Sequence, residues 1–145
     1  MYLPADQFTD VAAAVPDQSG SLTHGDILLL TPIAGDGSLP LPCLVLDLVA
    51  TRSGPRLLLA PGQAGIPATR DAPYEIGVRA PSEWAGAGLS GPLRFSGRDR
   101  ILMRATSGAI GRLSGSSFAR LNAVRARIHA ERDIAAYFRG IPDSD

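Results

Sequence analysis

The sequence predicts a small, mainly β protein with some α structure: an antiparallel β-barrel followed by a C-terminal amphipathic helix. Short apolar runs alternate with turns rich in glycine and proline between residues 25 and 104, a pattern typical of strands. The turns that join the first runs are too short for helical crossovers, which favours antiparallel pairing. A last apolar pattern, at helical spacing, follows from about residue 115 to 138.

The strands are expected where apolar residues are bounded by turn residues. Gly25 and Pro32 bound the first run, and a hairpin turn from Thr51 to Pro55 separates the second run from the third, which is expected to stop at Pro61. The expected strands span residues 26–32, 42–50, 56–60, 74–79, 92–95 and 100–104. The glycine-rich segment 82–91 is expected to be irregular, with Trp84 and Leu89 anchored in the core.

The terminal helix has the clearest pattern. Ser114 is expected to be its N-cap, and Gly140 lies near its end. Its apolar face is predicted to consist of Phe118, Leu121, Val124, Ile128, Ala135 and Phe138. Arginines at 120, 125, 127 and 132 fall on other faces. Strands followed by such a helix predict a compact barrel with the helix packed on it.

The length and hydrophobic content suit a single core. With 145 residues and 45% hydrophobic residues, the chain is expected to form an N-terminal arm (1–22), one barrel domain with its terminal helix (23–139) and a tail (140–145). No apolar run approaches the roughly 20 residues that cross a bilayer, and the first residues lack a secretory pattern. We therefore expect a cytoplasmic protein without membrane contact.

Metal and cofactor sites are not expected. The single cysteine, Cys43, excludes an intramolecular disulfide and a multi-cysteine zinc site, and we interpret it as a small buried residue. His24 and His129 lie far apart without paired carboxylates or cysteines. The glycine-rich segments at 34–37 and 86–91 match neither phosphate-loop nor dinucleotide patterns, and the chain contains no lysine.

The zero net charge conceals an uneven distribution. Residues 1–93 carry four arginines against nine acidic residues, whereas residues 94–145 carry ten arginines against five. Codon bias toward arginine explains the absence of lysine, and a guanidinium also suits bidentate phosphate contact. The C-terminal excess is a weak indication of an anionic partner.

Several fragments in order resemble the MazF/PemK family of toxin–antitoxin ribonucleases. They are Gly25-Asp26 before an apolar strand, Pro42-Cys-Leu-Val-Leu46, Leu58-Leu-Ala-Pro-Gly-Gln63, Gly88-Leu-Ser-Gly-Pro-Leu-Arg94 and Ile110-Gly-Arg-Leu-Ser114 at the head of the last helix. The resemblance covers residues 23 to 128. It implies an SH3-like barrel (MazF/PemK/CcdB-like), a homodimer, a small acidic antitoxin as partner, and metal-independent cleavage of single-stranded RNA.

The residues that carry catalysis in this family are not matched. The family arginine falls on Leu41, and the family threonine or serine falls on Pro61 or Gly62. In the family both groups stabilise charge on the phosphate in the transition state, but the side chains found here donate no hydrogen bond. The usual active site is absent on this alignment.

Relocated residues could replace the family site. The candidate catalytic residues in neighbouring segments are Arg52, Arg56, Arg70 and His24. The candidate RNA-binding residues are Gln63, Thr69, Arg70, Arg94, Arg98 and Arg100. Some have a simpler interpretation: His24 as an exposed histidine, and Arg94, Arg98 and Arg100 as part of a solvated surface partly paired with Asp99. His129 is interpreted as a surface residue. Asp47 is interpreted as facing outward from its strand; if it were buried, it would need a partner such as Arg56.

Two hypotheses of different classes follow. The first is a toxin-like endoribonuclease with relocated catalytic residues and an antitoxin as partner. The second is a catalytically inactive barrel that binds a protein or a nucleic acid. The ordered family fragments support the first, and Leu41 and Pro61 support the second.

Overall fold

The computed structural model describes residues 22–30, 40–65, 70–104 and 108–140. The expected arm (1–22) and tail (140–145) therefore lie almost wholly outside the described residues. The described elements are β1 (Asp26–Leu30), β2 (Leu41–Thr51), β3 (Gly54–Gln63), β4 (Glu75–Val78), α1 (Pro81–Gly86), β5 (Leu93–Ser96), β6 (Ile101–Met103), β7 (Gly111–Arg112) and α2 (Gly115–Gly140).

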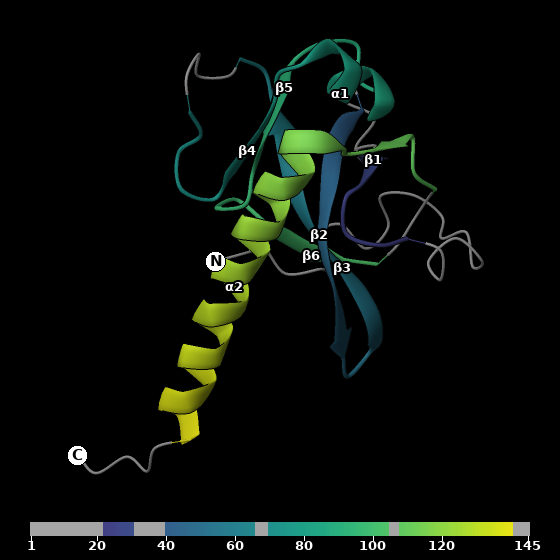
Figure 1. The fold of residues 1–145 in the computed structure, drawn as a ribbon. Coiled ribbons are helices and arrows are strands. Elements are labelled where there is room, and N and C mark those ends of the chain that lie inside the picture. The colour runs from purple at the N-terminus through teal and green to yellow at the C-terminus, as the bar shows by residue number, and fades with distance from the viewer. Residues whose placement is uncertain (1–21, 31–39, 66–69, 105–107, 141–145) are drawn as a thin grey trace.

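The strands form one curled antiparallel sheet that resembles half of a barrel (Figure 1). Its order is β4-β5-β3-β2-β1-β7, and β6 also pairs with β3. The long β2–β3 hairpin forms the centre, with a bulge between Val45 and Asp47. The predicted mainly β fold with antiparallel strands and a C-terminal helix is confirmed, whereas the SH3-like barrel stays a prediction.

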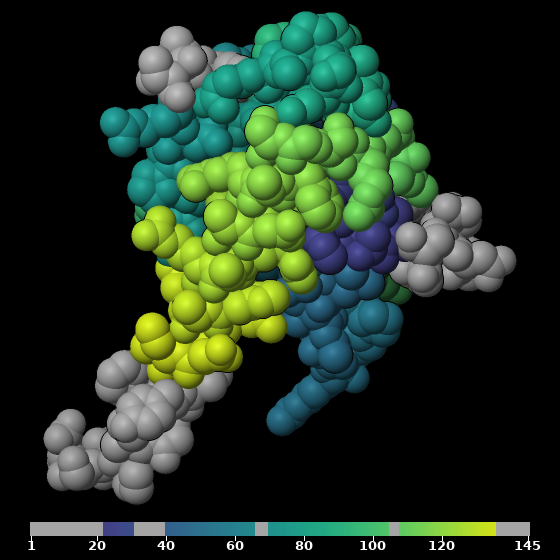
Figure 2. Space-filling view, in the orientation of Figure 1, coloured from purple at the N-terminus to yellow at the C-terminus, as the bar shows by residue number. Residues whose placement is uncertain are grey.

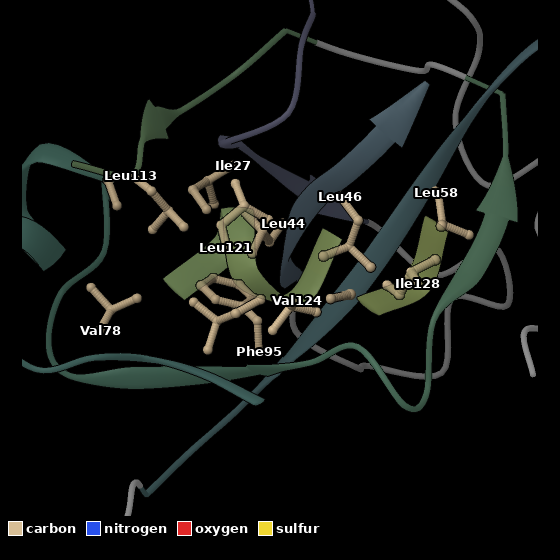
Figure 3. Packing of buried hydrophobic residues seen from close by; sticks show 13 residues of the cluster. Ile27, Leu44, Leu46, Leu58, Val78, Phe95, Leu113, Leu121, Val124 and Ile128 are labelled. Carbon is tan, nitrogen blue, oxygen red and sulfur yellow. The ribbon is translucent and has the colours of Figure 1, made fainter. Parts of the chain in front are cut away.

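The middle of each central strand, residues 43–46 in β2 and 57–60 in β3, is apolar without interruption because both faces of the sheet are buried there. Ile27, Leu44, Leu46 and Leu58 point toward α2, in a cluster that includes Phe95 (Figure 3). The alternate residues of the same strands form a second cluster on the opposite face. Its members are Leu22, Leu28, Leu30, Cys43, Val45, Leu57, Leu59, Ile101 and Met103. Leu44 and Leu46 of β2 and Leu57 and Leu59 of β3 are all buried.

Helix α2 crosses one face of the sheet and then extends beyond it (Figures 1 and 2). Leu121, Val124 and Ile128 are buried against the sheet, at the spacing of one helical face. Residues 131–135 are exposed, including Ala135, which we expected on the apolar face. The packed face thus ends at Ile128; the side chain of Phe138 lies outside the described residues.

Two local predictions were wrong. Strand β3 does not stop before Pro61 but continues to Gln63, because β5 pairs with its end at Gly62 and Gln63. Any side chain at Gly62 would clash, since its Cβ would lie 2.7 Å from Leu93 and 2.9 Å from the Pro42 carbonyl oxygen. The segment 82–91 is not wholly irregular, since α1 occupies its start with a proline in its first turn.

The start of α2 also differs from the prediction. The carboxylate of Glu83, on α1, accepts hydrogen bonds from the backbone N–H groups of Ser116 (3.0 Å) and Ser117 (3.2 Å). Glu83, and not the Ser114 side chain, therefore caps the first turn. The Ser114 carbonyl oxygen instead accepts a bond from the Ser117 hydroxyl.

Candidate nucleic-acid interface

The site begins at a strained turn that leads into β4. Pro73 and Tyr74 are the central residues of this turn, which is closed by a hydrogen bond from the Glu75 N–H to the Ala72 carbonyl (2.9 Å). Tyr74 has φ 68°, a left-handed conformation that usually belongs to glycine or asparagine in such turns. Its carbonyl accepts a bond from the Gly97 N–H (2.8 Å), which ties the turn to the segment after β5.

Three guanidinium groups surround the Tyr74 ring. Their central carbons lie 5.1 Å (Arg98), 5.8 Å (Arg100) and 5.3 Å (Arg127) from the ring centroid. Arg98 and Arg100 come from the turn after β5, and Arg127 comes from α2. Cation–π attraction offsets part of the mutual repulsion of three like charges.

Two more arginines extend this positive surface: Arg120 on α2, and Arg70 on the loop before the Tyr74 turn. Arg120 donates from Nε to the Glu75 carbonyl (2.8 Å) and from Nη2 to the Ala72 carbonyl (2.9 Å), so its guanidinium is fixed against the turn. Arg70 is exposed on the loop. The arginine face, as we name this surface, consists of Arg70, Arg98, Arg100, Arg120 and Arg127 around Tyr74.

A basin of about 520 Å³ is hollowed into the arginine face. It is lined by Arg70, Asp71, Ala72, Pro73, Arg120 and Arg127. Asp71 provides the only carboxylate of this described lining and is already paired with Arg79 (2.8 Å) and Arg120 (3.4 Å).

Part of the arginine face is not neutralised by the protein. Arg100 pairs with Glu131 (3.4 Å), and nearby Arg94 pairs with the buried Glu75 (2.6 Å). No carboxylate of the described residues lies within ion-pair distance of Arg70, Arg98 or Arg127. These three charges are therefore available to an anionic ligand.

The structure brings most of the predicted RNA-binding residues to this region. Arg70, Arg98 and Arg100 belong to the arginine face, and Gln63 pairs in register with Arg94 on the adjoining strands β3 and β5. Gln63 also lies 3.4 Å from Asp99. Thr69 lies outside the described residues. Arg98 and Arg100 lie in a turn, because residues 97–100 connect β5 and β6.

The candidate catalytic residues are not gathered in one place. Arg52 and Arg56 lie on the β2–β3 hairpin, at the opposite end of the molecule from the Arg70 loop (Figure 1). Arg56 donates to the carbonyls of Pro55 (3.0 Å) and Ser53 (3.4 Å). His24 precedes β1 and stacks on a phenyl ring of α2, 5.8 Å between centroids.

His24 is poorly placed to carry a positive charge. Burial lowers the pKa of His24, and the nearby charges of Arg125 and Arg112 lower it further, against opposite effects of Asp47 and Asp26. The imidazole is therefore neutral near pH 7 and can accept a proton, but no candidate catalytic arginine accompanies it.

Asp47 has a different environment from the one we expected. Its carboxylate does not pair with Arg56, which stands opposite Val49 in the register. It accepts instead from three residues of α2: His129 (2.6 Å), Arg125 (3.3 Å) and Arg132 (3.5 Å). His129 is thus a structural partner and not only a surface residue. Burial raises the pKa of Asp47, but bonds from His129, the Leu48 N–H and Arg125 outweigh it, and the net pKa is lowered.

The positions of the family catalytic residues line up on adjacent strands but offer no donors. Pro61 on β3 stands opposite Cys43 on β2, two residues from the exposed Leu41. A groove of about 400 Å³ beside them is lined by Leu29, Pro40, Pro42, Gly88, Leu89, Ser90, Gly91, Pro92, Leu93 and Ile110. This described lining contains no charged side chain that could stabilise a phosphate transition state.

The remaining chemical expectations concern metals, thiols and membranes. Within the described ranges, no three metal-binding side chains gather at one point. Burial raises the pKa of the Cys43 thiol to about 12, so it is a packed, unreactive side chain, as we interpreted it. Among the helices described, none combines the length and the apolar character needed to span a membrane.

No protein-family model matches the chain, and neither does any curated protein or solved structure. The homodimer, the antitoxin and the RNA cleavage that the family resemblance implies therefore stay predictions.

Sequence reasoning missed two members of the arginine face and its centre. Tyr74 was treated only as part of a half-exposed strand, and Arg120 and Arg127 only as solvated positions on the helix. Their separation of seven residues places both on one side of α2. The sequence shows that spacing, but it does not show that this side of α2 packs beside the Tyr74 turn.

Proposed function

We propose that the protein is a single-stranded RNA-binding module and that the arginine face is its contact surface. The observation that carries the proposal is the cluster of three guanidiniums around the Tyr74 ring, two of which, Arg98 and Arg127, have no described carboxylate partner. Like charges held together raise the free energy of the folded protein, and bound phosphates would offset this cost.

Single-stranded nucleic acid suits this arrangement better than a duplex. Proteins that bind single strands combine guanidinium groups for the phosphates with aromatic rings or arginine planes on which unpaired bases stack. Tyr74 and its three arginines offer both kinds of contact in one place. The choice of RNA over DNA rests on the family resemblance.

The proposal is one of binding, not of cleavage. The four candidate catalytic residues come from three separate parts of the molecule, and the described lining of the groove beside Leu41 and Pro61 contains no charged side chain. Binding needs only the arginine face, whereas transesterification also needs a base and a charge-stabilising donor at the same phosphate.

The test is binding of an unstructured RNA 12-mer with 5′-hydroxyl and 3′-hydroxyl ends, followed by fluorescence anisotropy with an internal dye. We expect Arg98→Gln/Arg127→Gln to weaken binding by about tenfold or more and to reduce the salt dependence by about two phosphate contacts. The control, Arg52→Gln/Arg56→Gln, removes the same charge from the distant hairpin and should change affinity by less than about twofold.

Equal weakening by both double variants would refute a localised site and leave only a general charge effect. A gel of the same samples in EDTA would reveal cleavage. Intact RNA in the bound fraction is the expected result, and cuts that disappear in the hairpin variant would instead favour a relocated ribonuclease site.

A further inference from the structure

The basin differs from the rest of the arginine face in shape and charge. At Tyr74 the guanidiniums lie over an aromatic ring, whereas the basin is a wide, open hollow between the 70–73 loop and α2. Three arginines and one carboxylate line it, which leaves an excess of two positive charges. That carboxylate, Asp71, also forms an ion pair with Arg79, which lies outside the lining.

The basin is also pre-organised. Arg120 is fixed by two backbone carbonyls and by Asp71. Arg127 is held over the Tyr74 ring, and Pro73 stiffens the loop on the other side. A ligand that enters would therefore order mainly Arg70, which is exposed on the loop, so the cost in conformational entropy would be small.

These properties match a phosphate monoester better than an internal phosphodiester. A monoester carries a charge of about −1.5 to −2 at pH 7 and three acceptor oxygens, whereas an internal diester carries a single negative charge. An arginine guanidinium can donate two parallel hydrogen bonds to such oxygens. The excess of two charges in the basin corresponds to the dianion.

We propose that the basin binds a terminal phosphate monoester, so that the protein prefers RNA with a phosphorylated end over RNA with hydroxyl ends. This inference rests on the proposed function, because the arginines around Tyr74 would hold the nucleotides that follow. Arg127 belongs to both parts, since it lines the basin and covers the ring. Arg70 belongs to the basin alone, and Arg98 to the ring alone.

The experiment compares three versions of one internally labelled RNA 12-mer: 5′-phosphate, 3′-phosphate and hydroxyl at both ends. Binding of one phosphorylated version should exceed that of the hydroxyl version by about tenfold, and whichever version gains identifies the end that the basin accepts. Arg70→Gln should reduce this preference to less than about twofold with the hydroxyl RNA unaffected. Arg98→Gln should weaken all versions in parallel and keep the preference.

Uridine 5′-monophosphate, uridine 3′-monophosphate and uridine, titrated calorimetrically, separate the two proposals. If wild-type protein binds all three RNAs equally, the basin inference is wrong and the RNA-binding proposal stands. If the wild-type protein binds no RNA but binds either monophosphate, and Arg70→Gln abolishes that binding, the basin inference stands and the RNA-binding proposal is wrong. If it binds neither RNA nor any monophosphate, both are wrong.

Discussion

At the scale of single residues, the bulge in β2 separates two adjacent side chains with opposite requirements. Leu46 lies at the irregularity between Val45 and Asp47 and is fully buried. Asp47, the next residue, is contacted by two guanidinium groups and one imidazole of α2. A bulge changes the direction of successive side chains, and here it lets an apolar residue and a carboxylate both face the helix side.

Leu46→Asp should abolish soluble folding. Its carboxylate would enter the cluster between sheet and helix, and a buried charge without a partner costs several kcal/mol, a large part of a typical stability of about 5–15 kcal/mol. Leu48→Asp is the matched control, because Leu48 is 42% exposed on the same strand. Circular dichroism with thermal melting checks both, and a cooperative melt of Leu46→Asp would refute the assigned burial.

His24 should make the protein less stable in mild acid. Its folded pKa lies below the ordinary 6.5, so the unfolded chain binds more protons as pH falls through 6.5 toward the folded pKa. The effect of His24 on the free energy of unfolding is thus absent above pH values near 6.5, and stability declines as the pH falls from there toward the folded pKa. His24→Gln cannot titrate and should reduce the loss of urea midpoint between pH 7.5 and 5.5. If the urea midpoint of His24→Gln falls as much as that of the wild type, other titrating groups cause the loss of stability.

At the scale of elements, the short helix α1 positions the long helix α2. The Glu83 carboxylate of α1 accepts three hydrogen bonds from Ser116 and Ser117. Burial raises the pKa of Glu83, but the bonds from both serines outweigh it, and the net pKa is lowered. Gly115, with φ 60°, leaves room for this contact, since a Cβ there would lie 2.6 Å from the carboxylate.

Glu83→Ala should destabilise the protein by about 1–2 kcal/mol, the usual effect of losing a helix cap. Glu131→Ala is the control, because its ion pair with Arg100 is longer and more exposed, and such pairs contribute about 0–1 kcal/mol. Urea unfolding at pH 7 measures both changes. If Glu83→Ala costs no more than Glu131→Ala, the cap is not a significant constraint on α2.

The elements also show where local sequence patterns suffice. The strands and α2 were predicted with boundaries within a few residues, because continuous apolar runs and helical spacing are strong signals. The segments that failed were α1, the two-residue strand β7 and the end of β3. Each depends on contacts with residues distant in sequence, such as the pairing of Gly62 with Phe95.

At the scale of the whole molecule, α2 completes the core of the half-barrel. The sheet buries one cluster on the face opposite α2 without its help. The other cluster needs Leu121, Val124 and Ile128 from the helix (Figure 3). The part of α2 after residue 130 contributes no buried side chain among those described.

Two truncations should therefore behave differently. A chain that ends at Leu113 exposes the face that α2 covers and should fail to fold or should aggregate. A chain that ends at Arg132 keeps every described buried residue of α2, as well as Glu131, and should lose at most about 1 kcal/mol. Differential scanning calorimetry measures both, and a large loss in the second would mean that the projecting half of α2 packs against something.

The sequence by itself determined the class of fold and the excess of arginine in its C-terminal third. Apolar periodicity and turn residues are local properties, so they predict elements directly. It did not determine the arginine face. Arg70, Arg98 and Arg127 are separated by 28 and 29 positions, and only the packing of α2 beside the Tyr74 turn brings them around one ring and one basin. Such convergence is a property of tertiary structure, because no local pattern specifies which surfaces of distant elements meet.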